Sequence, residues 1–541
     1  MDIEMVYADT LSSVVRANDA DFIVQETFDL DDVTPGDGLC TNSYGTCSLR
    51  AAITEANALL GTQSIYILPG TYFIRQGRAD DTNVSGDFDI TDDLVLTGYG
   101  MNQTSIKEAV NIGSFERFFD VDPLQTGLTV TIANLSLYSV DVGGDNGTGF
   151  RNNGNLTLEN IDISNSVGDS MIYNAGTINI NHSRFGDNII RNTIFNDTTG
   201  NMTIRNSLIT RNTARNNNGA GLLNNGTILV ENSTISYNKA SNPGGGILNN
   251  GGNMVLNFVT LFGNRGSSQS ASEFGGGFYN ANGTMTIGNT IITGNVVGSY
   301  NTVVNCTASL GTTTLSTGYN VFGDGGCPIT GETSTNIVLP DTTSVLLDTQ
   351  GNYGGGNETI SLLLGSPAID AANPAACPST DQRGVTRPAA CDVGAFERVS
   401  DSTLYPPTIT AVEINGINIE PQNLYPETTS QIAITFSENV INPVGNSEPD
   451  DVTNPTNYRV FSAGVNERID SLICDVPQSD DVAIAIDAVS YDAANHRATL
   501  TLNNGAALAN GIYALFVCGT TSIVDSDGNL LDGVAEDASS I

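Results

Sequence analysis

Apolar and polar residues alternate in six consecutive segments between Leu156 and Asn295. Two examples are Ile228-Leu229-Val230 and the stretch 202–206. An alternation of period two is typical of β-strands that bury one face. Each segment ends at an asparagine, and these residues recur every 23 to 31 positions as Asn165, Asn188, Asn212, Asn238, Asn264 and Asn295. Recurrence at such a period indicates one structural unit per copy, which cannot bury its apolar face alone.

A second set of asparagines recurs upstream within the same copies, as Asn152, Asn174, Asn196, Asn224, Asn249 and Asn280. Glycine-rich corners such as 244–246 and 275–277 separate the strands, without a helical stretch between them. Coils stacked in this way place like residues above one another, and we expect both sets to form hydrogen-bonded ladders. The predicted fold is all-β, a right-handed parallel β-helix. A leucine-rich horseshoe has a similar period, but it requires a dense leucine framework that these copies lack.

The chain before the repeats predicts a cap on the solenoid. The stretch 47–57 places Leu49, Ala52, Ile53 and Ala56 on one face at helical spacing. An open solenoid end exposes strand edges and core, and a helix can cover them. We therefore assign 21–64 to a disulfide-stapled helical cap and 65–398 to the β-helix.

Both ends of the chain differ from the repeats. The paired prolines at 406–407 indicate a stiff linker over 399–408. Short alternating segments then predict an immunoglobulin-like β-sandwich over 409–541. Residues 1–20 hold a strand-like stretch at 3–8, which fits a disordered tail, a first strand or a strand lent to a neighbouring subunit. The tail is the favoured interpretation.

Eight cysteines form four local pairs and lack the spacing of a zinc site, and the chain has only two histidines. An even count in such a chain suggests disulfides formed in an oxidising compartment, with nearest-neighbour pairing the favoured scheme. The first twenty residues lack a signal peptide, and no run of about 18 apolar residues predicts a membrane span. The expected pairs are Cys40/Cys47, Cys306/Cys327, Cys377/Cys391 and Cys474/Cys518.

The net charge of −39 is concentrated at the two ends of the chain. Such a surface disfavours binding to nucleic acid and anionic membranes and attracts calcium. The segment Asp525, Asp527, Asn529 and Asp532 alternates oxygen ligands around a glycine, as calcium loops do, although an ordinary turn between strands explains it equally well. The acidic loop 29–37 is a weaker candidate for calcium.

Two motifs carry a family resemblance. Cys47, Ser48, Leu49, Arg50 and Ala52 match the N-terminal module named for its Cys-Ser-Leu-Arg-Glu-Ala signature, with Ala51 in place of the glutamate. The stretches 365–370, 381–384, 387–388 and 391–397 resemble the closing segment of choice-of-anchor surface proteins, and 435–440 and 454–458 resemble bacterial immunoglobulin-like domains. These resemblances imply an exported bacterial surface protein with a β-helix, and they imply no activity.

Catalysis on a β-helix needs carboxylates on adjacent coils. The coils from Met171 to Asn295 offer only Asp187, Asp197, Glu231 and Glu273, and no two of these share a column. His182 occupies a position held by asparagine in other copies, which favours a structural role. The sequence therefore predicts a protein that is not an enzyme.

The predicted function is that of an extracellular structural protein, a stiff spacer that self-associates into a filament or layer through its end domains. Calcium is a candidate bridge between copies, and the cell wall or a glycan is a candidate contact of the end domains. An adhesin or glycan-binding surface protein is the alternative, although the absence of tryptophan weakens it. A polysaccharide lyase or hydrolase is the third candidate.

Overall fold

The computed structural model describes residues 3–7, 20–74, 83–108, 117–138, 147–214, 219–241, 243–266, 275–298, 301–309, 312–398, 407–414, 417–418, 429–443, 451–465, 469, 477, 480–509, 511–517, 523–525 and 531. The chain divides into two compact units. One comprises 13–351 and 356–398, and the other comprises 1–12, 352–355 and 399–541. The first unit is called the solenoid unit and the second the C-terminal unit.

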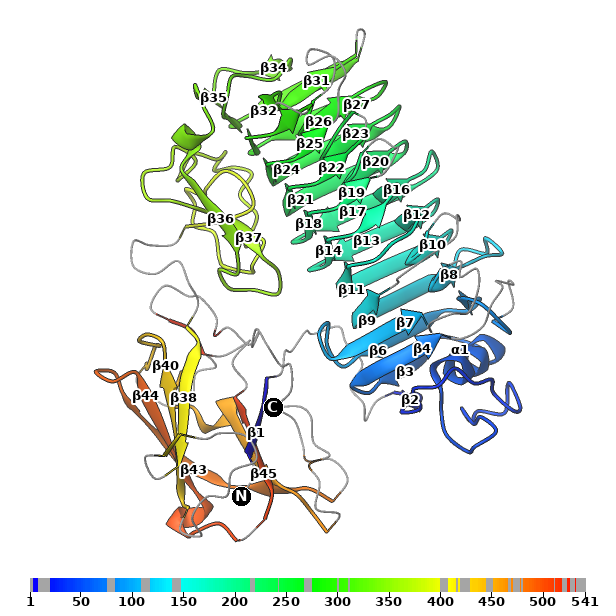
Figure 1. Cartoon of the computed structure of the whole chain (residues 1–541), viewed down its shortest axis with the longest axis vertical. Coiled ribbons are helices and arrows are strands. Elements are labelled where there is room, and N and C mark those ends of the chain that lie inside the picture. The colour runs from blue at the N-terminus through cyan, green and yellow to red at the C-terminus, as the bar shows by residue number, and fades with distance from the viewer. Residues whose placement is uncertain are drawn as a thin grey trace. The chain divides into compact units, whose positions relative to one another are not determined.

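The solenoid unit is a parallel β-helix, and its coils are stacked in the order of the sequence (Figure 1). Ten-residue strands in four of the coils bend from a first sheet into a second. The strands of the first sheet are β2 (Phe22–Val24), β3 (Gln63–Ile67), β6 (Leu94–Gly98), β9 (Thr129–Tyr138), β11 (Asn155–Ser164), β13 (Thr177–Asn181), β17 (Asn201–Arg205), β21 (Thr227–Ser236), β24 (Asn253–Phe262), β27 (Thr284–Gly288), β32 (Thr313–Gly318) and β34 (Thr330–Glu332). The second sheet combines the later halves of β9, β11, β21 and β24 with β4 (Gly70–Ile74), β7 (Thr104–Glu108), β14 (Arg184–Gly186), β18 (Leu208–Thr210), β28 (Ile291–Thr293), β33 (Val321–Phe322) and β35 (Ile337–Val338).

A third sheet and a row of short strands complete the coils. The third sheet is parallel throughout: β5 (Phe88–Ile90), β8 (Phe119–Val121), β10 (Phe150–Asn152), β12 (Ser170–Asn174), β16 (Asn192–Asn196), β20 (Leu222–Asn224), β23 (Ile247–Asn249), β26 (Phe278–Asn280) and β31 (Cys306–Ala308). The short row is β15 (Ile189–Ile190), β19 (Thr213–Ala214), β22 (Lys239–Ala240), β25 (Arg265–Gly266), β29 (Val296–Val297) and an antiparallel β30 (Thr302–Val303). Inward apolar side chains from all three sheets form one continuous core.

The bend between the first and second sheets requires a residue with positive φ in most coils. Asparagine tolerates this left-handed conformation better than most residues, which explains why it recurs there. His182 stands in the same column with φ of 45°. The column is Asn134, Asn160, His182, Asn206, Asn232, Phe258 and Asn289.

Two asparagine ladders run through the interior, and their members are fully buried. In the ladder that starts at Asn152, each side-chain amide donates to the next asparagine at 2.8–3.0 Å as far as Asn280. The other ladder runs from Asn188 to Asn295 and continues to Asn305. The assignment of Asn165 to this ladder is wrong. Ser164 pairs in register with Gly186, so Ser166 faces Asn188, and Asn165 takes the preceding corner position with φ of 53°.

Most residues of the signature-like motif 47–52 have a structural role in the N-terminal cap. Helix α1 (Leu49–Ala58) begins after Ser48, whose hydroxyl accepts a hydrogen bond from the Ala51 amide at 3.2 Å. Leu49 packs into the core, and Arg50 is buried in an ion pair with Asp29. Cys47 is joined to Cys40. The motif therefore closes the solenoid end.

Three disulfides lie within the described residues: Cys40–Cys47, Cys306–Cys327 and Cys377–Cys391. All three join nearest neighbours in the sequence. Cys474 and Cys518 lie outside the described residues. No helix among the described residues is long and apolar enough to cross a membrane.

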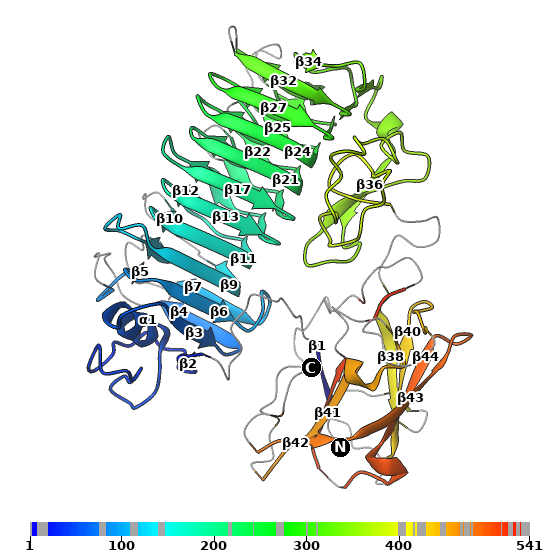
Figure 2. The ribbon, with the colours of Figure 1, turned by 180° about the vertical axis from the view of Figure 1, so that it is seen from behind.

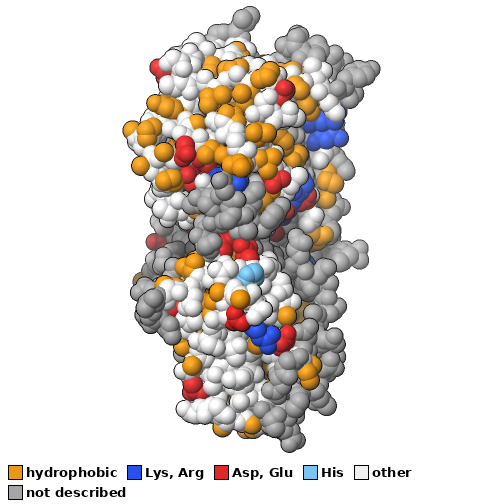
Figure 3. All heavy atoms as spheres, turned by 90° about the vertical axis from the view of Figure 1, so that its left-hand side faces the viewer, with side chains coloured by type: hydrophobic (Ala, Val, Ile, Leu, Met, Phe, Trp, Pro, Cys, Tyr) orange, Lys and Arg blue, Asp and Glu red, His pale blue; other side chains and the backbone are white. Residues whose placement is uncertain are grey.

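The closing segment, defined here as 343–351 and 356–398, packs back on the solenoid. It contains a 3₁₀ turn (Thr343–Val345) and the antiparallel pair β36 (Leu347–Gly351) and β37 (Thr359–Leu362). Asn232 donates to the Thr380 carbonyl at 2.7 Å, and Arg387 lies over the Phe258 ring. Hydrophobic side chains gather on the surface where this segment lies (Figure 3).

A buried charge cluster holds the closing segment together. Its members are Asp381, Arg383, Arg387, Asp392 and Glu397, with exposed fractions of 6% or less. Arg383 pairs with Asp381 at 2.8 Å, and Arg387 pairs with Glu397 at 2.8 Å. Three carboxylates therefore share two guanidinium groups. Burial, and then repulsion by Asp392, raises the pKa of Glu397 to about 7, and burial raises the pKa of Asp392 to about 6.

The solenoid unit is expected to lose stability as pH rises from 5 to 8. Because both pKa values are raised, the folded state retains protons that the unfolded state has released. The stabilisation is complete below the unfolded pKa values and is lost as pH rises through about 6 and 7. Glu397→Gln should flatten this dependence, which is on the order of 2 kcal/mol. Unfolding followed by circular dichroism at each pH tests it, with exposed Glu332→Gln as control. An unchanged slope in Glu397→Gln would contradict the assignment.

The C-terminal unit contains two sheets, as expected for a sandwich (Figure 2). One has the order β39 (Ile417–Asn418), β38 (Ile409–Ile414), β40 (Gln431–Phe436), β44 (Arg497–Leu502) and β43 (Ile486–Asp492), all antiparallel. The other has the order β1 (Ile3–Tyr7), β45 (Tyr513–Val517), β41 (Tyr458–Ser462) and β42 (Val482–Ile484). Single 3₁₀ turns cover Pro455–Asn457 and Asn503–Gly505. The favoured interpretation of 1–20 as a disordered tail is wrong for Ile3–Tyr7, which pair with β45 in parallel.

Candidate functional site

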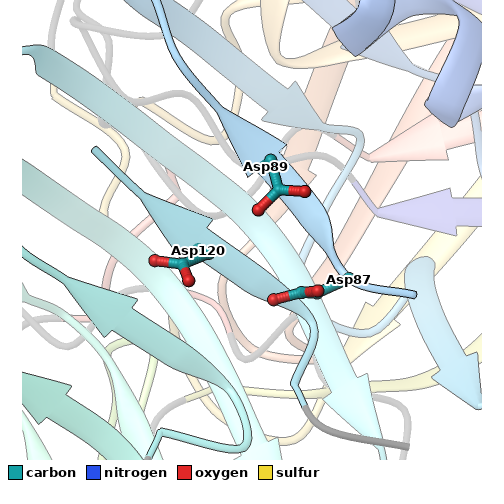
Figure 4. A group of neighbouring side chains, drawn as sticks. All are labelled: Asp87, Asp89 and Asp120. Atoms are coloured by element: carbon teal, nitrogen blue, oxygen red, sulfur yellow. The ribbon is translucent and has the colours of Figure 1, made fainter. Parts of the chain in front are cut away.

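Three carboxylates from adjacent coils meet on the outer face of the third sheet (Figure 4). Asp89 lies in β5 and pairs in register with Asp120 in β8, while Asp87 comes just before β5. One oxygen from each lies within 4.8 Å of the others, and all three residues are at most 1% exposed. The placement follows from strand alternation, since Phe88 and Phe119 pack into the core and the aspartates between apolar neighbours face outward.

Two arginines partly neutralise this carboxylate cluster, defined as Asp87, Asp89 and Asp120. Arg117 Nη1 lies 3.1 Å from Asp87 Oδ2 and 2.9 Å from Asp120 Oδ2. Arg151, the next residue in register on β10, donates to Asp120 Oδ2 at 3.1 Å. The backbone amide of Asn83 donates to Asp89 Oδ2 at 2.8 Å. Three carboxylates and two guanidinium groups give a formal charge of −1, so a divalent cation would bring it to +1.

Further side chains lie in register with the carboxylates on the following coils of the solenoid. Asp89, Asp120, Arg151, Tyr173 and Phe195 occupy one column on successive coils, and we call this column the outer row. Adjacent strands lie about 4.8 Å apart, so the row presents a different chemical group at each step. Its last three residues are partly exposed.

The side chain of Tyr173 is held in place by a hydrogen bond and a ring contact. Its hydroxyl donates to Asp197 Oδ2 at 2.5 Å, and its ring lies edge-on to Phe195 with centroids 5.4 Å apart. Burial, followed by the hydrogen bond and negative charge of Asp197, raises the pKa of Tyr173 to about 12. The phenol is therefore protonated at neutral pH.

The outer row combines groups that suit an acidic sugar polymer. Carboxylate oxygens are the ligands that calcium prefers, a guanidinium binds a carboxylate in two parallel hydrogen bonds, and aromatic rings provide apolar contact. This site lies in 87–120, upstream of the regular coils on which the sequence-based prediction rested. The repeated pattern Phe-Asp-Ile and Phe-Asp-Val, at 88–90 and 119–121, was the available signal.

Of the residues predicted to bind calcium over 525–532, the structure describes only Asp525, so this site stays a prediction. Asp525 is buried and bridges Val440, whereas Asp527, Asn529 and Asp532 lie outside the described residues. In the acidic loop 29–37, Asp29 pairs with Arg50, and Asp32 accepts a hydrogen bond from the Thr41 amide at 2.9 Å. Glu231 pairs with Arg205 on the neighbouring coil, and Asp187 pairs with Arg184 and Arg211. Within the described residues, these acids serve local ion pairs and turns.

No family model and no curated protein matches the chain. Among solved structures, it resembles the pectate lyase Pel9A, with 16% identity and a TM-score of 0.35 over 72% of this chain and 98% of that one. It also resembles the catalytic domain of a GH87 α-1,3-glucanase, with 12% identity and a TM-score of 0.33 over 55% and 63% of the two chains. A third is the A-module of the Azotobacter vinelandii mannuronan C-5 epimerase AlgE4, with 15% identity and a TM-score of 0.28 over 59% and 97%.

These neighbours share the parallel β-helix, and at such identities they carry no residue role or substrate over to this chain. The prediction that the chain is not an enzyme is overturned, because its premise was that no carboxylates meet on adjacent coils, whereas Asp89 and Asp120 meet on β5 and β8. The neighbouring structures named above are those of a lyase, a glucanase and an epimerase.

Proposed function

We propose that the chain is an exported enzyme of the polysaccharide lyase or hydrolase type, acting on an acidic polysaccharide along the outer row. The observation that carries the proposal is the carboxylate cluster on adjacent coils, with Arg151 at its partly exposed edge. Pectate and mannuronan, named in the neighbouring structures, are polymers of this class. The three disulfides support a site of action outside the cell.

Each residue of the outer row would have a different role in the reaction. Arg151 would bind a sugar carboxylate, and the ring of Tyr173, whose hydroxyl donates to Asp197, would provide an apolar face beside that sugar. Asp87, Asp89 and Asp120 offer three oxygen ligands of the kind that a divalent cation prefers, and calcium would need further ligands to reach its usual six to eight. Such a cation would supply positive charge beside a substrate carboxylate.

Turnover of an acidic polysaccharide is expected to require calcium and Arg151. Polygalacturonate, alginate and a neutral glucan should be assayed with calcium and with chelator, by absorbance of unsaturated uronates for lysis and by reducing ends for hydrolysis. Arg151→Gln removes a charged hydrogen bond worth about 1.5–3 kcal/mol, so kcat/KM should fall about 10- to 100-fold. Asp120→Asn should weaken the calcium dependence.

Arg205→Gln is the matched control, since Arg205 also pairs with a carboxylate on an adjacent coil but belongs to another sheet. It should leave turnover unchanged. Binding without turnover would favour an adhesin. Absence of both binding and turnover on every acidic polymer, with and without calcium, would contradict the proposal and leave the cluster a structural ion-pair network.

A further inference from the structure

Strand β45 of the C-terminal unit lies inside its sheet because β1, from the other end of the sequence, pairs with one of its edges. The sheet order is β1-β45-β41-β42, and the register pairs Ile3 with Tyr513 and continues to Tyr7 with Val517. This is the one parallel pairing among the described strands of the unit, and its partners are 510 positions apart (513 minus 3). The remaining described pairs join strands within 409–517.

All five residues of β45 are buried, and they serve two apolar clusters. Tyr513, Leu515 and Val517 belong to the main core of the unit. Ala514 and Phe516 belong to a second cluster with Phe461, whose ring lies 5.3 Å from that of Phe516. A strand that is apolar on both faces resembles the interior strand of a sheet rather than its edge.

Without β1, the edge of β45 would present unpaired amide and carbonyl groups beside a buried surface. An edge of this kind is a template for pairing with another chain. Each buried polar group left unsatisfied costs about 1–3 kcal/mol, so the site favours occupation by some strand. The pairing relies on main-chain hydrogen bonds, which are the same whether the strand comes from the same chain or from another copy.

The link between β1 and the rest of the chain is compatible with exchange of β1 between two copies. Residues 8–21 join β1, which belongs to the C-terminal unit, to β2 in the solenoid unit. These fourteen residues span at most about 50 Å when extended. A link of this length gives an effective concentration of about millimolar for pairing within one chain. Pairing between chains competes when the copies fold together at high local concentration.

We propose that β1 of one copy can occupy the β45 edge of a second copy of this chain, so that copies associate head to tail. Donor and acceptor are different surfaces, so the association is heterologous and propagates unless the geometry closes it into a ring. This inference concerns assembly, and it is independent of the proposed glycan chemistry.

Cysteine pairing between two variants tests the exchange. Glu4 and Ala514 are in register, and neighbouring Cα atoms of paired strands lie within the range that a disulfide spans. The chain with Glu4→Cys is mixed with the chain with Ala514→Cys, unfolded and refolded together at rising concentration, and run on a non-reducing gel. A cross-linked heterodimer that increases with concentration is expected. Thr499→Cys, on the other sheet, replaces Ala514→Cys in the control mixture and should give none.

A heterodimer absent at every concentration, while the double variant cross-links within one chain, would overturn the proposal. If Ala514→Cys fails to fold, the chain lacking residues 1–12 is titrated with a labelled peptide of that sequence. Saturable binding that unlabelled peptide reverses, and that the intact chain lacks, is expected. No binding to the shortened chain would equally overturn the proposal.

Discussion

Replacing Asn238 with alanine is expected to lower the free energy of unfolding of the solenoid unit by about 4 kcal/mol or more. Its side chain donates to the Ile209 carbonyl at 2.9 Å and to Asn264 at 3.0 Å, and it accepts from the Asn212 amide at 3.1 Å and the Asn212 side chain at 2.8 Å. Alanine removes all four hydrogen bonds and leaves their partner groups without a hydrogen-bond partner in the buried interior. Each stranded group costs about 1–3 kcal/mol unless water enters.

Asn250→Ala is the matched control. Asn250 also donates to an asparagine on the neighbouring coil, Asn225, at 3.3 Å, but it lies on the surface. Its loss should change stability by at most about 0.5 kcal/mol. The chain has no tryptophan, so denaturation is followed by circular dichroism, with the transition of the solenoid unit fitted separately. Equal losses in the two variants would show that the ladder contributes nothing beyond a surface hydrogen bond.

The repeat pattern was sufficient to predict the solenoid, because burial of alternate residues and stacking of like residues are both local in sequence. The repeat pattern predicted one member of the ladder incorrectly. Counting from asparagine to asparagine assigned Asn165 to the ladder, whereas the backbone places Ser166 there and Asn165 at the preceding corner. Asparagine suits both positions, by hydrogen bonding in one and by tolerance of positive φ in the other. Residue identity alone cannot separate these two causes.

The carboxylate cluster escaped prediction for a related reason. Asp89 and Asp120 are brought together by coils of irregular length, before the repeat becomes uniform, so no fixed period links them in the sequence. The pairing of β1 with β45 is even harder to predict from the sequence, since any apolar strand-like segment could in principle occupy that edge. The sequence offered a first strand as one alternative to a tail, and the three-dimensional register identifies β45 as its partner.

Replacing Arg50 with methionine is expected to cost about 3–5 kcal/mol, because it leaves a buried carboxylate without its counter-ion. Arg50 is 1% exposed, and its guanidinium donates to both oxygens of Asp29, at 2.6 and 3.0 Å. It also donates to the carbonyls of Gly86 at 2.7 Å and Asp87 at 3.1 Å. The same side chain therefore joins helix α1 to the backbone that carries the carboxylate cluster.

Arg205→Met provides the comparison, since the Arg205–Glu231 pair has side-chain exposures of 46% and 23%. Exposed pairs contribute about 0–1 kcal/mol, so this variant should unfold almost as the parent does. Adding Asp29→Asn to Arg50→Met removes the uncompensated charge and should restore part of the lost stability. A double variant no more stable than Arg50→Met would show that the carbonyl contacts, and not the ion pair, anchor the cap. In that case the arginine of the motif would act mainly as a clamp on 86–87, and its loss would disturb the carboxylate cluster directly.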